Sequence, residues 1–141
     1  MSAREYIQTH TNFSDAGMYK EGFGDDENNC CVRAIAIAFR LSYKESYGLA
    51  AAAGRPHGKG WYMYMIMDYM KKNGYNLRKI PLDKYPNVHQ LLKQKREGRF
   101  IAVTKDHTFP IINGEIWDSE INRPRQYIKR LYKVIAKCRF P

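Results

Sequence analysis

Two short segments of this chain carry residue types that together support nucleophilic chemistry at a thiol. The first places Cys30 where a polar turn passes into a nearly all-apolar helix, expected over residues 29–40. The second, much further along the chain, has His107 before an Asn-Gly turn and Asp118 after it. A thiol at a helix start, with an imidazole and a carboxylate on one hairpin, is the arrangement that an activated nucleophile requires.

The position of Cys30 favours the thiolate, which is the nucleophilic form of cysteine. A free thiol has a pKa near ~8.5, and the unpaired N–H groups and dipole of a helix N-terminus lower that value. Cys30 falls in the first turn of the expected helix, whereas Cys31 is rotated by about 100° and points elsewhere. We therefore assign Cys30 as the nucleophile over Cys31; the alternative is that both are buried core cysteines.

A general base must come from one of four histidines: His10, His57, His89 and His107. We prefer His107 because it begins a strand with apolar neighbours and because Asp118 lies across the turn. His57, in a Gly-rich loop, is the second choice. The remaining two are expected at the surface.

The Asn-Gly turn predicts how His107 and Asp118 meet. An Asn-Gly dipeptide between apolar runs is typical of a two-residue hairpin, here with residues 113–114 as the loop. Ile112 then pairs with Glu115, and His107 and Asp118 become diagonal neighbours on one face. Diagonal cross-strand side chains lie roughly 7–8 Å apart, a gap that His and Asp can close. Asp118 would orient the imidazole, and His107 would take the thiol proton.

Further residues have supporting roles. Glu120 is the alternative orienting acid. The Cys30 backbone N–H and a side-chain amide of Asn28 or Asn29 are candidate oxyanion donors, although either asparagine also suits a helix N-cap. No metal and no cofactor is expected, since the cysteines and histidines lack the spacing typical of zinc sites.

The order of the expected elements predicts an α+β fold, with N-terminal helices packed on a C-terminal antiparallel sheet. We expect further helices at about 43–53, which a capping box of Ser42 and Glu45 would start, and at 60–73 and 88–96. Strands are expected at 75–82, 99–105, the 107–118 hairpin and 127–137. The last segment also fits a helix, but its β-branched residues favour a strand. We expect one domain spanning residues 1–141, in which 1–24 are irregular apart from a short strand near 6–13.

The composition indicates an ordered globular protein. The chain has 141 residues, 44% apolar and 13% aromatic, and no apolar run approaches the ~20 residues of a membrane span. No secretory signal is expected at its start. Adjacent Cys30 and Cys31 rarely bridge, which leaves Cys138 alone, so a reducing cytoplasm is expected.

The net charge of +10 is the second feature that bears on function. It suggests a polyanionic partner, either nucleic acid or an acidic protein surface. The alternative is a basic surface with no dedicated partner.

Three segments resemble the papain-like cysteine peptidase fold, in the small single-domain form of phage and bacterial genomes. The helix start N-C-x-V-R-A at 29–34 resembles the (D/N)-C-x-x-R-A cysteine helix of those proteins. The strand G-R-F-I-A-V-x-x-x-H at 98–107 and the return N-G-x-x-x-D at 113–118 resemble their His and Asp hairpin. The resemblance extends over about residues 25–135, although the Gln that usually precedes the cysteine is missing.

The resemblance implies that Cys30, His107 and Asp118 are nucleophile, base and orienting acid. It implies a cysteine hydrolase (peptidase, isopeptidase or amidase) that acts on a protein or peptide, in the cytoplasm of a bacterial host if the chain is phage-encoded. The alternative is an inactive papain-like fold that serves as a basic binding module for nucleic acid or a host protein.

Overall fold

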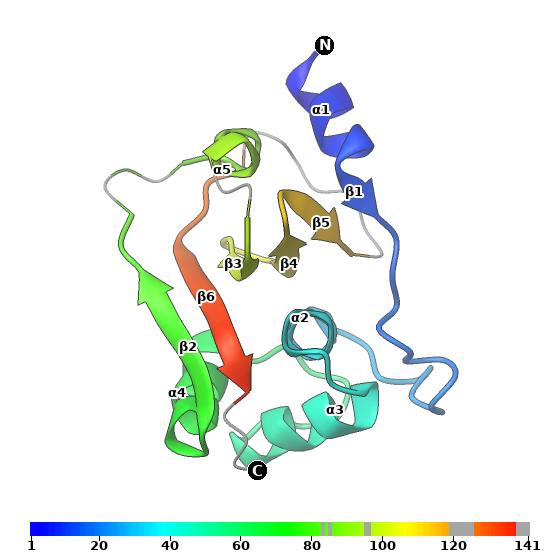
Figure 1. Ribbon diagram of the computed structural model, residues 1–141. Coiled ribbons are helices and arrows are strands. Elements are labelled where there is room, and N and C mark those ends of the chain that lie inside the picture. The colour runs from blue at the N-terminus through cyan, green and yellow to red at the C-terminus, as the bar shows by residue number, and fades with distance from the viewer. Residues whose placement is uncertain (83, 85, 95–96, 119–125, 138–141) are drawn as a thin grey trace.

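A mixed six-stranded sheet with helices on both faces forms the core of the molecule, which is therefore an α+β protein (Figure 1). The computed structural model describes residues 1–82, 84, 86–94, 97–118 and 126–137. In this part of the chain the helices are α1 (Ala3–Thr9), α2 (Cys30–Phe39), α3 (Tyr43–Ala52), α4 (Met63–Lys72) and α5 (Val88–Gln94). The strands are β1 (Thr11–Asn12), β2 (Tyr75–Ile80), β3 (Arg99–Val103), β4 (Thr108–Ile112), β5 (Glu115–Trp117) and β6 (Arg130–Lys137).

The strands follow the order β1-β5-β4-β3-β6-β2. The pairs from β5 to β2 are antiparallel, as expected, but β1 pairs with β5 in parallel. A purely antiparallel sheet was therefore the wrong expectation. The parallel pair joins the N-terminal segment to a hairpin late in the chain, so no local pattern predicts it.

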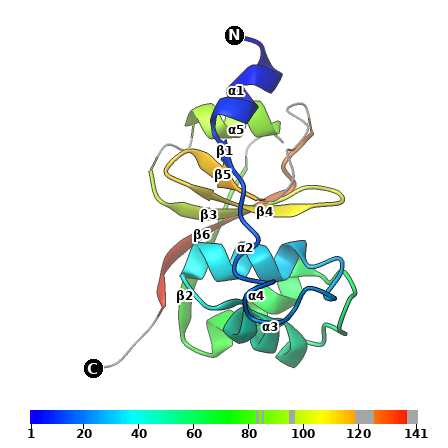
Figure 2. The same cartoon turned by 90° about the vertical axis from the view of Figure 1, so that its right-hand side faces the viewer.

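Two hydrophobic clusters fill the spaces on either side of the sheet. Helices α2, α3 and α4 cover one face, and α1 and α5 cover the other (Figure 2). Helices therefore pack on both faces of the sheet. The first cluster is built around fully buried Ile35, Tyr43, Ile66 and Met70, and the second around Ile7, Leu91, Phe109 and Ile116.

The N-terminal segment is more regular than its composition suggests. The Ser2 hydroxyl accepts a hydrogen bond from the Glu5 N–H at 3.1 Å, and the Glu5 carboxylate accepts one from the Ser2 N–H at 3.2 Å. This capping box starts α1, and the helix is held down by fully buried Ile7. The expectation that residues 1–24 are irregular is therefore wrong for α1. The strand expected near 6–13 is confined to the two residues of β1, because residues 6–9 belong to α1.

The helix and strand predictions for the middle of the chain are largely confirmed. The capping box of Ser42 and Glu45 is present at the start of α3. Helix α2 ends where Arg40 adopts a left-handed backbone with φ of 58°. The segment 127–137 contains a strand rather than a helix, and the helix expected over 60–73 begins three residues later, at Met63.

The β4–β5 hairpin has the predicted turn and register. Asn113 and Gly114 have φ values of 51° and 81°, so both adopt the left-handed backbone that a type I′ turn requires. Ile112 pairs with Glu115. The strand expected over 99–105 ends at Val103, and residues 104–107 connect it to β4.

Candidate active site

Cys30 is the first residue of α2 and lies partly exposed. The turn before it is formed by Asn28, whose φ is 50°, and by Asn29, the N-cap residue. Cys31 is buried in the hydrophobic cluster under α2, α3 and α4. Of the two adjacent thiols, Cys30 alone is therefore both partly exposed and at the helix start.

His107 lies in the β3–β4 connection, immediately before β4. Its backbone N–H donates to the Thr104 hydroxyl at 3.1 Å, and its carbonyl accepts from the Thr104 N–H at 2.8 Å. The ring also stacks near Phe109, with ring centroids 5.8 Å apart. These contacts hold the imidazole at the end of the sheet.

Asp118 directly follows β5 and is almost completely buried. Its backbone N–H donates to the Asn12 carbonyl at 2.9 Å, and its carbonyl accepts from the Ser14 N–H at 3.2 Å. The parallel strand β1 thus holds the backbone of Asp118 in place. Glu120, the alternative orienting acid, lies outside the described residues.

The structure brings the three predicted side chains together. His107 Nε2 forms a short hydrogen bond with Asp118 Oδ2. The imidazole also forms a hydrogen bond with the Cys30 thiol. Since Nε2 faces the carboxylate, Nδ1 is the ring nitrogen available to the sulfur. The backbone N–H of Thr108 is a second hydrogen-bond partner of the Cys30 sulfur.

The charges of this site favour a thiolate next to an imidazolium. Burial raises the pKa of the Cys30 thiol, but the hydrogen bond and charge of His107, the Thr108 N–H and the charge of Arg33 together bring it below its ordinary value. Burial lowers the pKa of His107, but its hydrogen bonds with Asp118 and Cys30 outweigh this and raise it to about 10. The two shifts describe one ion pair, in which each charge stabilises the other.

Cys31 has the opposite electrostatics. Burial, followed by the negative charge of neighbouring Cys30, raises the pKa of the Cys31 thiol to about 12. Cys31 is therefore a neutral thiol at ordinary pH. This supports the preference for Cys30 over Cys31.

Arg33 is a residue of this site that the sequence reasoning did not assign. Its guanidinium is buried and donates from Nη1 to Asp118 Oδ1 at 2.5 Å and from Nε to Asn29 Oδ1 at 2.9 Å. One carboxylate oxygen of Asp118 thus faces Arg33 and the other faces His107. The sequence did contain a signal for this role: Arg33 is the single charged residue in an otherwise apolar helix, and a buried charge needs a partner of opposite charge.

The side-chain amides of the two candidate oxyanion donors have protein partners in this structure. Asn28 Nδ2 donates to the Gly58 carbonyl at 3.1 Å. Asn29 Nδ2 contacts the Tyr43 hydroxyl at 3.0 Å and the Met18 sulfur at 2.6 Å, and it gives no side-chain cap to α2. A role for either amide in an oxyanion hole stays a prediction, and the Cys30 N–H at the helix start is the simpler donor.

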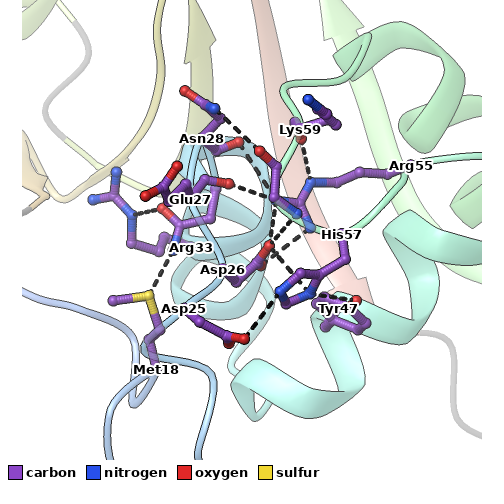
Figure 3. Close-up of polar contacts among 12 residues, drawn as sticks. Met18, Asp25, Asp26, Glu27, Asn28, Arg33, Tyr47, Arg55, His57 and Lys59 are labelled. Carbon is purple, nitrogen blue, oxygen red and sulfur yellow. Dashed lines mark hydrogen bonds and ion pairs between the residues drawn. The ribbon is translucent and has the colours of Figure 1, made fainter.

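Two of the acidic residues before Cys30, Asp25 and Asp26, have their side chains in a separate cluster with Arg55 and His57, to which Glu27 adds its backbone carbonyl (Figure 3). Asp26 is buried and accepts hydrogen bonds from Arg55 at 2.9 and 3.1 Å, from Tyr43 at 2.5 Å and from the Gly58 N–H at 2.8 Å. Burial raises the pKa of Asp26, but these donors, Arg55 first, lower it overall. The arginine thus offsets a negative charge that would otherwise oppose the thiolate.

His57, the second-choice base, belongs to this acidic cluster. Its Nδ1 lies 2.8 Å from the Tyr47 hydroxyl, and its Nε2 lies 3.5 Å from Asp25 Oδ2 (Figure 3). Asp26 Oδ1 lies 3.7 Å from Nδ1. The imidazole that contacts the Cys30 thiol is that of His107.

Comparison of this chain with protein-family models, with curated proteins and with solved structures returned no match. Among the described residues, no helix combines the length and apolar character that crossing a membrane requires. In the same residues, no group of three or more His, Cys, Asp or Glu side chains is arranged to hold a metal ion. Cys30, His107, Asp118 and Arg33 are the side chains that form the candidate site.

Proposed function

We propose that this protein is a cysteine-dependent hydrolase of amide-type bonds (a peptidase, isopeptidase or amidase) with a papain-like fold. Cys30 is the nucleophile, His107 the general base and acid, and Asp118 the orienting acid. The observation that carries the proposal is the His107 ring, which contacts the Cys30 thiol on one side and the buried Asp118 carboxylate on the other. The substrate class is a protein or peptide.

The chemistry begins at the sulfur. The Cys30 thiolate attacks the carbonyl carbon of the scissile bond and forms a C–S bond, while the carbonyl π electrons move to the oxygen. The Cys30 backbone N–H, at the start of α2, stabilises this oxyanion. The tetrahedral intermediate then collapses, the C–N bond breaks, and the His107 imidazolium gives its proton to the leaving amine.

The second half-reaction releases the acyl group. Water attacks the thioester on Cys30 while neutral His107 takes a proton from it. The C–S bond breaks, the carboxylic acid leaves, and the Cys30 thiolate and His107 imidazolium are restored. Asp118 holds the ring through Nε2 in both steps, and Arg33 holds the other oxygen of that carboxylate.

The order of elements supports the papain-like fold within this proposal. A cysteine at the start of a core helix, further helices after it, and a late antiparallel hairpin with the His and the Asp occur in the expected sequence. The mixed edge of the sheet and α1 are additions on the β5 side. Fold alone does not select among peptidase, isopeptidase and amidase activity.

Thiol labelling tests the proposal directly. Iodoacetamide at neutral pH should alkylate Cys30 many times faster than a free peptide thiol, and Cys30→Ser should abolish this labelling. His107→Ala should slow the labelling toward the rate of an ordinary thiol, because the neighbouring cation is lost. Cys31→Ser is the matched control and should label like the native protein. A Cys30 that reacts no faster than a free thiol would contradict the proposal.

Acyl transfer distinguishes a hydrolase from a merely reactive thiol. With p-nitrophenyl acetate, mass spectrometry should show an acetyl group on Cys30 that forms and then disappears by hydrolysis. Asp118→Asn should retain acetylation but slow the release, since the imidazole is no longer held in the correct tautomer. An acetyl group that never hydrolyses would leave Cys30 as a reactive thiol without hydrolase activity.

A further inference from the structure

A basic groove runs along the start of β6 and the adjoining end of β2, and its smaller hollow extends to α4. It consists of two adjoining hollows, of about 730 and 390 Å³, that share Lys79 and Arg130. We call it the β2–β6 groove. Its other described lining residues are Tyr64, Met67, Asp68, Lys71, Leu77, Tyr127, Lys129 and Tyr132.

Positively charged side chains predominate over acidic ones among the described residues that line the groove. Among its described lining residues, four are cationic, and three of these (Lys71, Lys79 and Lys129) are exposed, whereas Asp68 is the one acid. The fourth cation, Arg130, is held in place, with its guanidinium carbon 5.3 Å from the centre of the Tyr64 ring. A fixed, partly covered guanidinium suits planar recognition of a carboxylate.

One end of the groove is aligned with the candidate active site across neighbouring strands, in a cross-strand row formed by Thr108, Val103 and Arg130. Val103 pairs with Thr108 on one side and with Arg130 on the other. Directly paired residues point to the same face of a sheet, and Thr108 supplies the backbone N–H that contacts the Cys30 sulfur. Two strand spacings of about 4.8 Å therefore put Arg130 roughly 10 Å from Thr108 along the sheet.

Arg130 also lies on the same face of the sheet as Cys30. Tyr132, two residues after Arg130, belongs to the hydrophobic cluster under α2, α3 and α4. Arg130 therefore faces the side of the sheet covered by α2, α3 and α4, which carries Cys30 at the start of α2. In Figure 1, α4 and β2 lie on one side of β6 and α2 lies on the other, so the groove continues away from the thiol.

We propose that the β2–β6 groove selects polypeptide substrates with an acidic side chain a short distance from the bond that Cys30 attacks. An extended peptide advances about 3.3 Å per residue, so roughly 10 Å corresponds to three or four residues. Arg130 binds the carboxylate, and Lys79 and Lys129 attract further acids along the groove. This inference rests on the proposed hydrolase function and names its substrate class.

The position of the groove favours a polypeptide over a nucleic acid. Exposed Tyr127 and the basic side chains would also suit a single strand, whose bases stack on aromatic rings. A nucleic acid, however, offers no amide-type bond to a thiol held beside the same row of the sheet. The experiment therefore compares the two ligands at equal charge.

Binding is measured by fluorescence anisotropy on the Cys30→Ala protein, which cannot turn the ligand over. The probes are a fluorescein-labelled (Gly-Glu)5 peptide, the corresponding (Gly-Lys)5 peptide and a dT6 oligonucleotide, which carries the same charge as the acidic peptide. The acidic peptide should bind, and the basic one should not. Lys79→Glu with Arg130→Glu should weaken the acidic peptide about tenfold or more, since two attractive charges become repulsive.

The control replaces two exposed lysines outside the groove, Lys20→Glu with Lys44→Glu, for the same change in net charge. It should leave the affinity within about twofold. An equal loss of affinity for the acidic peptide in both double variants would show that binding depends only on the net charge of the protein, and it would overturn the proposal. Tighter binding of dT6 than of the acidic peptide would assign the groove to nucleic acid instead. The proposal would also be overturned if the acidic peptide did not bind.

A second readout links the groove to Cys30. Peptidyl acyloxymethyl ketones with Glu or Lys four residues from the reactive carbon should alkylate the native protein with about a tenfold preference for Glu. Lys79→Glu with Arg130→Glu should remove or reverse this preference. If iodoacetamide labelling of Cys30 is normal but the preference is absent, the groove proposal fails while the hydrolase stands. If that labelling fails, the binding measurement still decides what the groove recognises.

Discussion

At the scale of single residues, the site is a row of alternating charges. The Cys30 thiolate faces the His107 imidazolium, which faces the Asp118 carboxylate, which faces the Arg33 guanidinium. Each buried charge has an opposite neighbour, which is the condition under which ionised groups remain stable away from water. The pKa of the Cys30 thiol therefore depends on both the adjacent His107 and the more distant Arg33.

The pH dependence of Cys30 alkylation should report this ion pair. Thiolate forms as pH rises through the pKa of Cys30, which lies below its ordinary value, so the rate should reach half of its plateau at a lower pH than that of a free peptide thiol. In His107→Ala the burial remains but the attraction is lost, so the midpoint should move upward. Stopped alkylation followed by mass spectrometry across the pH range measures both curves. Identical midpoints would contradict the ion pair.

Arg33→Met should expose the role of the last charge in the row. It leaves the buried Asp118 carboxylate without one partner, and breaking a buried ion pair costs about 3–5 kcal/mol of unfolding free energy. It should also raise the pKa of Cys30, because Arg33 is one of the charges that lower it. Urea denaturation and the alkylation midpoint measure the two effects.

Arg33→Lys is the conservative comparison for this prediction. It keeps the positive charge but loses the forked contact with Asn29 and Asp118. Compared with Arg33→Met, it should bring the pH midpoint of alkylation most of the way back to the native value but restore only part of the unfolding free energy. A loss of stability with no movement of the midpoint in Arg33→Met would make this arginine purely structural.

At the scale of elements, the β4–β5 hairpin sets the position of Asp118 relative to His107. Its two-residue turn requires positive φ at both Asn113 and Gly114. A different turn would shift the register by a residue and turn Asp118 to the other face of the sheet. Local turn chemistry therefore controls the geometry of the site.

Gly114→Ala should destabilise the protein by about 1–2 kcal/mol, because an L-residue other than glycine is strained at a φ of 81°. Gly48→Ala is the matched control, since Gly48 lies within α3 with open space around its added Cβ. That change should stabilise the protein by about 0.5–1 kcal/mol. Chemical denaturation of both variants provides the measurement, and equal effects would contradict the turn assignment.

At the scale of the whole molecule, the sheet connects two hydrophobic cores. The core under α2, α3 and α4 carries Cys30 on its rim, while the core under α1 and α5 supports the strands from which His107 and Asp118 extend. Strand β1 and the residues after it add two backbone hydrogen bonds: the Asp118 N–H donates to the Asn12 carbonyl, and the Ser14 N–H donates to the Asp118 carbonyl. The N-terminal segment thus supports the site through β1 at the edge of the sheet and through α1 on the face opposite α2.

Ile7→Ala should reveal this support. Ile7 is fully buried between α1 and the sheet, and truncation of a buried Ile costs about 2–5 kcal/mol of unfolding free energy. Phe13→Ala, at a side chain that is 66% exposed, should change stability by no more than about 0.5 kcal/mol. Thermal or urea unfolding of the pair tests whether α1 belongs to the cooperative core, and equal stabilities would exclude it.

Local patterns predicted those parts of the fold that depend on neighbours in the chain. The start of α2 at Cys30, the capping box of α3 and the Asn-Gly turn each follow from a few adjacent residues. The capping box of Ser2 and Glu5 was equally local, and the same rule would have found α1. The polar composition of the N-terminal segment obscured that signal.

The sequence by itself determined the residue types of the candidate site, their order in the chain and the face that His107 and Asp118 share. Those features follow from helix starts, strand alternation and turn chemistry, which act over a few residues. Only the tertiary structure decided that Arg33 reaches Asp118, that β1 pairs in parallel with β5, and that Arg130 shares a cross-strand row with Thr108. These contacts join residues far apart in the chain, and they form only when both cores close on the same sheet.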